Sequence, residues 1–294
     1  MALVVGRART DELLSSGLRQ RRDGTVQAFP GQRRLRWVRP ILLLSSRRVL
    51  AGDYLRRGVA EFVGTFALIF VGAGAVIYGD LVGTALANGL VIAVMVTSVG
   101  MISGGFFNPA ITIAFALTRR ISVTLAAWYL LVQLGAAALA ALLLKWVIPA
   151  PIQTPTHLGA PGLLSSASNG HVSAGQGVAI EAVLTFFLVW VVFATVVDAR
   201  NNFKQVAGLA IGLTITLDVL MGFGLTGAAV NPARAFGPQL VANHWSHFWV
   251  WYVGPIAGGA IAALLYEGLY LTPAGPKPLE QDAGDSAPGT AALD

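Results

Sequence analysis

The sequence predicts an all-α membrane protein of six spanning helices and two half-helices, arranged as two inverted repeats of three spans. Three observations support this fold class: long apolar runs, an Asn-Pro-Ala triplet that occurs twice, and a pattern that the two halves share. The 294 residues are 55% hydrophobic and 12% charged, whereas a soluble domain carries about 25% charged residues.

The composition excludes several classes of site. The chain has no cysteine, so disulfides, thiolate metal sites and cysteine nucleophiles are excluded. Its four histidines leave little for a metal cluster, and no phosphate-binding loop with lysine occurs. We therefore expect no enzyme activity, no cofactor and no metal.

The basic residues are concentrated at the N-terminus. Residues 1–57 hold thirteen of the twenty basic side chains, all arginine, against four acids. Such an arm favours contact with a membrane surface rather than with nucleic acid. We expect residues 1–53 to be a disordered cytoplasmic arm and residues 273–294 a disordered cytoplasmic tail. A start site assigned too far upstream is a second hypothesis for the arm, which N-terminal sequencing would decide.

Six apolar segments are each close to the roughly 20 residues that span a bilayer. They cover residues 57–78, 83–102, 121–148, 176–198, 205–222 and 246–270. Two shorter stretches, Ala110–Leu117 and Arg234–Val241, follow the triplets and are too short to span. They fit half-helices that stop near the middle of the membrane.

Each triplet predicts the start of a helix. The two copies are Asn108-Pro109-Ala110 and Asn231-Pro232-Ala233. Proline disfavours helix in the residue before it and is favoured as the first helical residue, with asparagine as the N-cap. A helix start within hydrocarbon leaves backbone donors without partners, so two such starts imply a polar cavity.

Loop charges predict the orientation. Basic residues flank three loops: Arg56, Arg57, Arg119, Arg120, Arg200 and Lys204. The 149–175 connection has none, and an excess of Lys and Arg marks the cytoplasmic side. Both termini are therefore expected inside and residues 149–175 outside.

Two further features concern the membrane. Because the chain has no cysteines, we expect a bacterial inner membrane. Four tryptophans near span ends are expected to form an interfacial belt: Trp146, Trp245, Trp249 and Trp251.

The chain repeats itself with opposite orientation. The pattern Glu-x-x-x-Thr-Phe begins at Glu61 and again at Glu181, 120 residues later, and the triplets are 123 residues apart. We expect a channel domain over 54–272, with repeats 54–148 and 176–270. Because three spans per repeat is an odd number, the repeats face opposite ways, and broken helices at their interface indicate a solute pathway.

The motifs resemble those of a known family. They are Ser103-Gly-Gly-Phe-Phe-Asn-Pro-Ala110, Thr226-Gly-Ala-Ala-Val-Asn-Pro-Ala-Arg234, Phe236-Gly237-Pro238 and Val253-Gly254-Pro255. Over residues 55–270 the sequence resembles the major intrinsic protein family of aquaporins and aquaglyceroporins, in particular a bacterial-type aquaporin. The resemblance implies the aquaporin-like right-handed bundle, a pore in each subunit and a homotetramer.

Physical reasoning on the triplets agrees with the resemblance. Each helix start carries roughly half a positive charge, and the amides of Asn108 and Asn231 can donate hydrogen bonds into the pore. A water that accepts from both points its hydrogens outward, which interrupts the chain along which a proton would hop. The paired dipoles also repel cations.

Selectivity is expected at four residues. Arg234 is the one basic residue well inside the membrane part, and such a charge is functional by default. By resemblance it is the filter arginine, and Asn88, Val219 and Ala228 are the other filter positions. The strict water-channel pattern has an aromatic residue at Asn88 and histidine at Val219, so this filter should be wider.

Other departures leave the solute open. Glycerol channels also lack the filter histidine, but they usually carry Asp where this chain has Ala235, and they lack the aromatic pair Trp251-Tyr252. We therefore expect a passive water channel, with small neutral solutes as an open alternative. Rival interpretations are a glycerol or urea facilitator of this fold, an ion-coupled transporter and a junction protein. Membrane lipid is an expected partner, and nucleic acid is not.

Three acids and the histidines allow more than one interpretation. Glu61 and Glu181 either relay protons or, as we favour, accept hydrogen bonds from the loops before the triplets. Asp218, in the fifth span, has no counterpart in the first repeat and could line the pore, bond a neighbouring helix or face a subunit contact. The histidines, favoured as ordinary surface residues, could alternatively form a pH gate. They are His157, His171, His244 and His247.

Overall fold

The computed structural model describes residues 18–20, 26–28, 39–166, 168, 170–202 and 204–271, with side chains from residue 52 onward. The chain divides into two compact units, residues 1–51 and 52–294. The expected tail over 273–294 and most of the expected arm lie outside the described residues, so their disorder stays a prediction.

Two short strands and the beginning of a helix are described in the first unit. Strands β1 (Leu18–Gln20) and β2 (Val26–Ala28) pair antiparallel. Helix α2 (Arg39–Ala67) begins earlier than the sequence analysis expected. Its second residue is proline, which is favoured in the first turn of a helix, and the Arg-rich and Leu-rich residues that follow have high helix propensity.

The second unit contains the six expected spans. The first combines α2, a π-helical turn (Leu68–Ala73) and α3 (Gly74–Ile77). The others are α4 (Leu81–Ser103), α6 (Val123–Val147), α8 (Ala174–Val192) with a π-helical turn (Phe193–Val197), α9 (Ala207–Thr226) after a 3-10 turn (Lys204–Val206), and α11 (Val250–Tyr266) with a π-helical turn (Glu267–Leu271).

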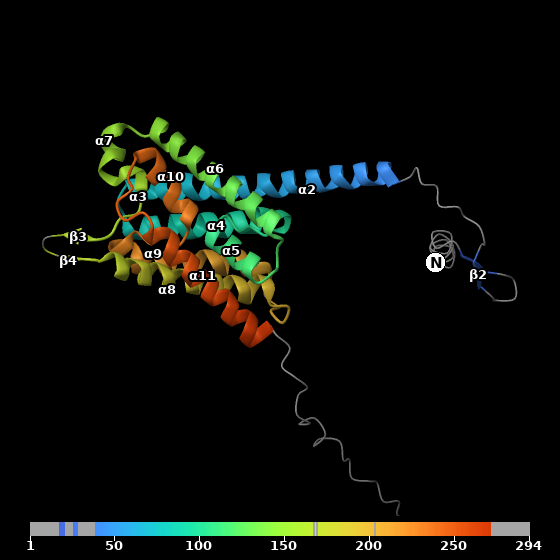
Figure 1. Ribbon diagram of the computed structural model, residues 1–294. Helices are drawn as coiled ribbons and strands as arrows, with labels where there is room; N and C mark the ends of the chain where they lie inside the picture. Colours follow the sequence, from blue (N-terminus) through green and yellow to red (C-terminus); the bar gives the residue numbers. More distant parts are fainter. Residues whose placement is uncertain are drawn as a thin grey trace, which may run out of the picture. The chain divides into compact units, whose positions relative to one another are not determined.

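Shorter elements connect the spans. They are α5 (Pro109–Leu117), α7 (Ala150–Gln153), a 3-10 turn (Thr154–Gly159), the antiparallel strands β3 (Ser165–Ser166) and β4 (Gly170–His171), and α10 (Pro232–Ala242). Helices α5 and α10 are the two expected half-helices. In Figure 1, α7 and the β3–β4 hairpin lie at one end of the bundle, whereas α11 ends at the other.

Local signals set the helix ends. The Asp80 side chain accepts hydrogen bonds from the first turn of α4, and Ser173 and Gln176 form a capping box at the start of α8. Helices α4 and α9 both end at a glycine in the left-handed conformation, Gly104 and Gly227. These two stops are equivalent in the two repeats, and each leads into the loop before a triplet.

The repeats exchange their half-helices. Helix α5 of the first repeat packs on α11, the last span of the second, and α10 of the second repeat packs on α6, the last span of the first (Figure 1). The second spans of the two repeats, α4 and α9, pack against each other, as do α8 and α11. The interface between the repeats therefore brings the two half-helices together.

Glycines allow α4 and α9 to approach closely. A Cβ added to Gly89 would collide with Thr216 Oγ1 and lie 2.5 Å from the Gly212 carbonyl oxygen. A Cβ on Gly212 would collide with the Gly89 carbonyl oxygen in return. Helices in lipid commonly pack by such close approach of their backbones, because hydrophobic burial contributes little to helix association there.

Three of the four tryptophans expected in an interfacial belt are exposed, and the belt itself stays a prediction. Trp146 is 82% exposed, and Trp245 and Trp249 are also exposed. The expectation for Trp251 is wrong, because this side chain is fully buried and its Nε1 donates to the Thr226 carbonyl oxygen over 3.0 Å. It thus supports the loop before the second triplet.

The α4–α9 contact gives a testable prediction. Gly89→Val should prevent the two helices from closing, because backbone of α9 occupies the space for any side chain. We expect this variant to be lost from the monodisperse peak in detergent size-exclusion chromatography. Gly135→Val is the matched control, since nothing lies within 4 Å of a Cβ there. A monodisperse Gly89→Val protein would contradict the packing.

Candidate functional site: a pore between the repeats

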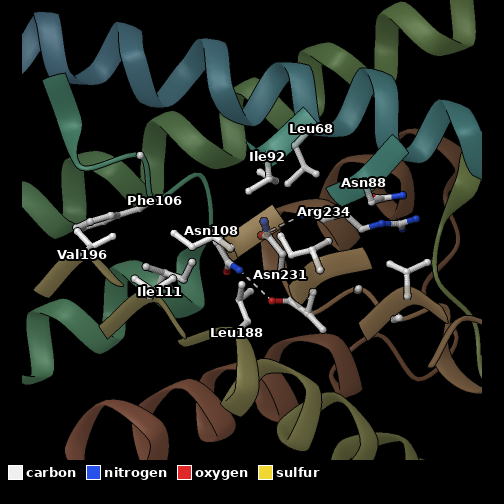
Figure 2. Close-up of a pocket in the computed structure, with 18 of the residues that line it drawn as sticks. Leu68, Asn88, Ile92, Phe106, Asn108, Ile111, Leu188, Val196, Asn231 and Arg234 are labelled. Carbon is white, nitrogen blue, oxygen red and sulfur yellow. Dashed lines mark hydrogen bonds between the residues drawn. The ribbon is translucent and has the colours of Figure 1, made fainter. Parts of the chain in front are cut away.

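One cavity is lined by residues from both repeats. Its walls are mostly aliphatic, and its polar side chains are Asn88, Asn108, Asn231 and Arg234. Figure 2 shows Asn108 and Asn231 in the middle, Phe106, Ile111 and Val196 towards one end, and Asn88 and Arg234 towards the other. We call the Arg234 end the outer mouth and the Val196 end the inner mouth.

Both triplets start helices as the sequence predicts. Asn108 Oδ1 accepts from the Ala110 backbone N–H over 2.9 Å, and Pro109 is the first residue of α5. Asn231 Oδ1 accepts from Ala233 over 2.9 Å and from Arg234 over 3.3 Å, and Pro232 begins α10. The side-chain oxygen of each asparagine is therefore directed to its own helix, which leaves the amide nitrogen to act elsewhere.

Each amide nitrogen donates to the opposite repeat. Asn108 Nδ2 donates to the Val230 carbonyl oxygen over 2.9 Å, and Asn231 Nδ2 donates to the Phe107 carbonyl oxygen over 2.9 Å. These reciprocal bonds fasten the two helix starts tip to tip. An asparagine amide carries two N–H donors, so each side chain retains one for the cavity.

In the first repeat, Glu61 holds the loop before the triplet. Its carboxylate accepts from Phe106 N over 3.0 Å, from Phe107 N over 2.8 Å and from Ser103 Oγ over 2.6 Å. Gln133 Nε2 donates a fourth bond over 2.9 Å. Glu61 thus accepts hydrogen bonds from the loop before the triplet, as the sequence analysis favoured. The hydrogen bond from Gln133 was not expected, because the third span carries no motif that points to it.

In the second repeat, Glu181 makes the equivalent contacts with the loop before the triplet. It accepts from Ala229 N over 3.0 Å, from Val230 N over 2.8 Å and from Thr226 Oγ1 over 2.7 Å. Phe107 and Val230 occupy equivalent positions and both have positive φ, 48° and 45°. This conformation is unfavourable for residues other than glycine and persists only where surroundings impose it. The carboxylates supply that constraint.

The four expected filter residues line the same cavity. Arg234 is 3% exposed, and its Nη1 donates to the Gly159 carbonyl oxygen over 2.8 Å. Asn88 Nδ2 donates to the carbonyl oxygens of Thr84, over 2.8 Å, and Gly72, over 3.3 Å. Val219 and Ala228 add apolar wall. Sequence reasoning missed Gly159, because a glycine in the long 149–175 connection gives no sign of the residue that it contacts.

Asp218 does not line the cavity. It is 3% exposed, and among the described residues its Oδ2 has no hydrogen-bond partner. It therefore differs from Glu61 and Glu181, whose oxygens are fully engaged. Of the alternatives for Asp218, lining the pore receives no support from the structure.

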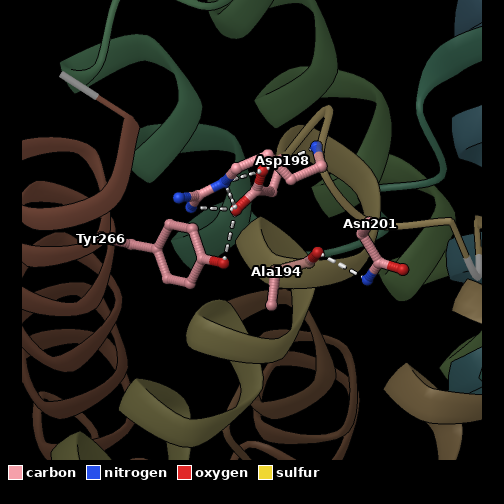
Figure 3. A network of polar contacts seen from close by, with 5 residues as sticks. Ala194, Asp198, Asn201 and Tyr266 are labelled. Carbon is pink, nitrogen blue, oxygen red and sulfur yellow. Dashed lines mark hydrogen bonds and ion pairs between the residues drawn. The ribbon is translucent and has the colours of Figure 1, made fainter. Parts of the chain in front are cut away.

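A polar network joins the segment after α8 to α11 (Figure 3). Asp198 Oδ2 accepts from Arg200 Nη2 over 2.6 Å and from the Tyr266 hydroxyl over 3.1 Å, and Asn201 Nδ2 donates to the Ala194 carbonyl oxygen over 2.8 Å. Hydrogen bonding from Arg200 holds the pKa of Asp198 well below its usual range. The Asp198 carboxylate is therefore charged at neutral pH.

Glu181 and Asp218, two of the buried carboxylates of the second repeat, give opposite predictions. Glu181→Gln should lower the apparent melting temperature by roughly 5 °C, because charge-assisted bonds to a buried group contribute about 2 kcal/mol or more. Asp218→Asn should not lower it, because a buried carboxylate oxygen without a partner costs stability rather than adding it.

Thermal unfolding of both purified variants in detergent, followed by intrinsic fluorescence, makes this comparison. A fall for Asp218→Asn as large as that for Glu181→Gln would show that Asp218 has a stabilising partner after all.

Comparison with known proteins agrees with this geometry. The family model described as Major intrinsic protein matches residues 49–266. Aquaporin TIP4-4 of Zea mays is 41% identical over 79% of this chain and 93% of its own length. Aquaporin-4 of Mus musculus is 34% identical over 79% of this chain and 72% of its own length. These relatives come from a plant and an animal, so they give no support to the expected bacterial type.

A solved structure extends the comparison to the fold. The aquaglyceroporin from Plasmodium falciparum superposes with a TM-score of 0.64 at 24% identity, covering 74% of this chain and 96% of its own. Two inverted repeats, six spans and two half-helices are thus found together with a matching family model. The chain belongs to the major intrinsic protein family.

Proposed function

We propose that the protein is a passive, bidirectional water channel that excludes protons and ions. One observation carries the proposal: two asparagine amides, each fastened to the opposite repeat, lie midway along a cavity with mostly aliphatic walls. The names of the relatives, two aquaporins and an aquaglyceroporin, are consistent with it.

The paired amides act on water orientation. Asn108 and Asn231 each have one N–H donor left, and both belong to helix N-termini that carry partial positive charge. A water molecule between them gives both lone pairs to these donors and directs its hydrogens to the two mouths. It cannot also accept from a neighbour, so a proton has no continuous chain of acceptors along which to move.

The aliphatic walls of the cavity explain why water would pass through it rapidly. Aliphatic side chains offer a water molecule no hydrogen bonds, so it is held at few points and is not trapped. Ions are opposed because the mostly aliphatic walls cannot replace their hydration shell, and the two helix dipoles oppose cations. Arg234 adds a fixed positive charge at the outer mouth, which opposes cations further.

The filter supports small neutral solutes as a second candidate substrate. Among the described residues, no hydrogen bond uses Asn88 Oδ1, and Asn88 lines the same end of the cavity as Arg234 (Figure 2). Val219 and Ala228 stand where bulkier groups would narrow the passage. A solute that both donates and accepts, with a small apolar part, matches this combination.

Coupled transport is less well supported. An ion-coupled transporter needs a titratable group along its pathway, and Arg234 is the one ionisable side chain that lines the cavity in the described part of the chain. Glu61 and Glu181 are engaged by backbone donors instead. A junction protein with a closed pore remains the structural alternative.

The proposal also covers the membrane location, the oligomeric state and the orientation of the protein. The protein is an integral membrane protein, since six helices are long and apolar enough to cross a membrane and the family is one of membrane channels. A homotetramer and cytoplasmic termini stay predictions, whereas the plant and animal relatives do not support the expected bacterial inner membrane. Cysteine-accessibility labelling of residues introduced in the 149–175 connection would test the orientation.

Reconstitution tests the proposed function. We expect proteoliposomes to shrink in stopped-flow light scattering much faster than protein-free vesicles when the osmolyte draws out water. Parallel runs with glycerol, urea and ammonia measure the second candidate substrates. Glycerol flux without fast water flux would favour a solute facilitator, and unchanged water permeability would favour a junction protein.

Arg234→Val tests the filter charge. Removing the guanidinium should leave water permeability roughly intact while cations or larger solutes begin to pass, because their electrostatic and steric barrier is gone. Arg56→Val is the matched control, since Arg56 is exposed and far from the cavity lining. If selectivity is the same in Arg234→Val as in the control, Arg234 does not act as a filter.

The filter width can be tested by adding side chains. The double variant Asn88→Phe, Val219→His should reduce urea and glycerol flux and retain water flux, because a bulky ring and a second donor narrow the passage. Leu86→Phe, at an exposed position of the same helix, controls for the added volume. Equal solute flux in the double variant and the control would place the constriction elsewhere.

A further inference from the structure

A glycine of the first span lies against the filter residue Asn88. Gly72 is buried in the π-helical turn Leu68–Ala73, and turns of this kind inside α-helices are frequently found at functional sites. Asn88 belongs to α4 and lines the same end of the cavity as Arg234 (Figure 2). Its Nδ2 donates to the Gly72 carbonyl oxygen over 3.3 Å. The contact therefore joins the first span to the wall of the outer mouth.

One side chain fills the space beside Gly72. A Cβ added to Gly72 would collide with Asn88 Oδ1 and would lie 2.9 Å from Cγ and 3.4 Å from Nδ2 of the same residue. These are the three nearest atoms, and all of them belong to the carboxamide of Asn88. The missing side chain of Gly72 thus leaves a niche in the wall, which we call the Asn88 niche, and the carboxamide occupies it.

Gly72 differs from the glycines that serve helix packing. A Cβ on Gly258, for example, would collide with the Ala182 carbonyl oxygen, so the backbone of another helix excludes a side chain there. The three nearest atoms at Gly72 include no backbone, and Gly72 is not among the glycines with positive φ. Neither backbone conformation nor close backbone contact requires glycine at this position, so the requirement comes from Asn88.

Hydrogen bonds fix the orientation of the Asn88 carboxamide. An amide nitrogen carries two N–H donors, and here they are taken by the carbonyl oxygens of Thr84, over 2.8 Å, and Gly72. With oxygen and nitrogen exchanged, an oxygen would face both carbonyl oxygens, so the contacts select the orientation observed. The carboxamide oxygen is the atom that is left without a hydrogen bond among the described residues.

This oxygen reaches the cavity. In the part of the chain that the structure describes, the buried side-chain atoms without a partner belong to Thr65, Asp218 and Gln239. Asn88 Oδ1 also has no partner but is absent from this group, so it is in contact with the space that Asn88 lines. The niche therefore holds one hydrogen-bond acceptor at the edge of the passage.

We propose that Gly72 sets the width of the outer mouth: its missing side chain gives the Asn88 carboxamide a niche in the wall, so that Asn88 supplies an acceptor without obstructing the passage. The inference rests on the proposed channel function and deepens it, because it names a further residue that determines what can pass. Gly72 is a positioning residue, since it acts on a solute only through Asn88.

A methyl group at position 72 has a defined effect. Asn88 contacts Gly72 on one side and lines the cavity on the other. A carboxamide that is expelled from the niche loses its bond to the Gly72 carbonyl and moves away from the first span, towards the cavity. The passage then narrows, and the flux falls, because the diameter of a pore and the polar groups on its lining determine what passes.

Stopped-flow shrinkage of proteoliposomes tests the inference with a double-mutant cycle. We expect Gly72→Ala to lower the water permeability several-fold for the same amount of reconstituted protein. Asn88→Ala removes all three atoms that the new methyl group would meet. The double variant Gly72→Ala, Asn88→Ala should therefore be as permeable as Asn88→Ala alone. A glycine needed only for helix packing would show no such rescue.

Gly74→Ala is the matched control. Gly74 belongs to the same span, and the one atom within 4 Å of a Cβ there is Leu144 Cδ2 at 3.3 Å, the end of a flexible side chain. This variant should keep the permeability of the unchanged protein. A permeability of Gly72→Ala equal to that of the control would overturn the inference, as would a loss that persists in the double variant.

A labelling experiment tests the same displacement without measuring flux. The chain has no cysteine, so Asn88→Cys introduces the single thiol of the protein. In this background, Gly72→Ala should raise several-fold the rate at which methyl methanethiosulfonate labels the thiol, because the sulfur atom no longer fits the niche. Intact mass spectrometry measures the rate. The background also protects against misfolding, since cysteine has only one heavy atom beyond Cβ that the methyl group could meet.

The two measurements separate the inference from the proposed function. Equal labelling rates in Asn88→Cys with and without Gly72→Ala would contradict the displacement at position 88, whatever the flux. Absence of water flux in the unchanged protein would contradict the proposed function, and the labelling rates would then decide on the niche alone.

Discussion

The structure depends on the need to satisfy backbone polar groups at the middle of a membrane. Two helices begin there, and lipid offers no partner for their exposed donors. The reciprocal bonds from Asn108 to the Val230 carbonyl and from Asn231 to the Phe107 carbonyl solve this problem for both repeats at once. Glu61 and Glu181 then bind the N–H groups of the same two strained residues. The inverted repeat follows, because each half-helix needs the other.

The reciprocal bonds between the two half-helices also create the polar centre of the cavity. Fastening two helix N-termini tip to tip concentrates two positive dipole ends in one place, which is unfavourable unless a polar guest compensates them. Water can do so, and a cation cannot. The same bonds leave one donor on each asparagine and turn the side chains of both repeats into one cavity wall. The stability of the centre and the proposed exclusion of protons are therefore two consequences of a single arrangement.

The sequence predicted those features of this arrangement that depend on residues close together in the chain. The six spans, the two helix starts and the carboxylates Glu61 and Glu181 each have a sequence signal. Contacts between distant segments had none: the Gly159 carbonyl on Arg234, the burial of Trp251 and the stack of His157 on His244. Tertiary packing decides these, so a glycine in a loop or a tryptophan at a span end does not reveal its partner.

The central claim is that the paired asparagines pass water and interrupt proton transfer. The most direct test measures both fluxes in the same proteoliposomes, with stopped-flow shrinkage for water and an entrapped pH-sensitive dye for protons under an imposed pH gradient. The account predicts water permeability that rises with the amount of protein while proton flux stays at the level of protein-free vesicles. Proton flux that rises in proportion to protein would contradict it.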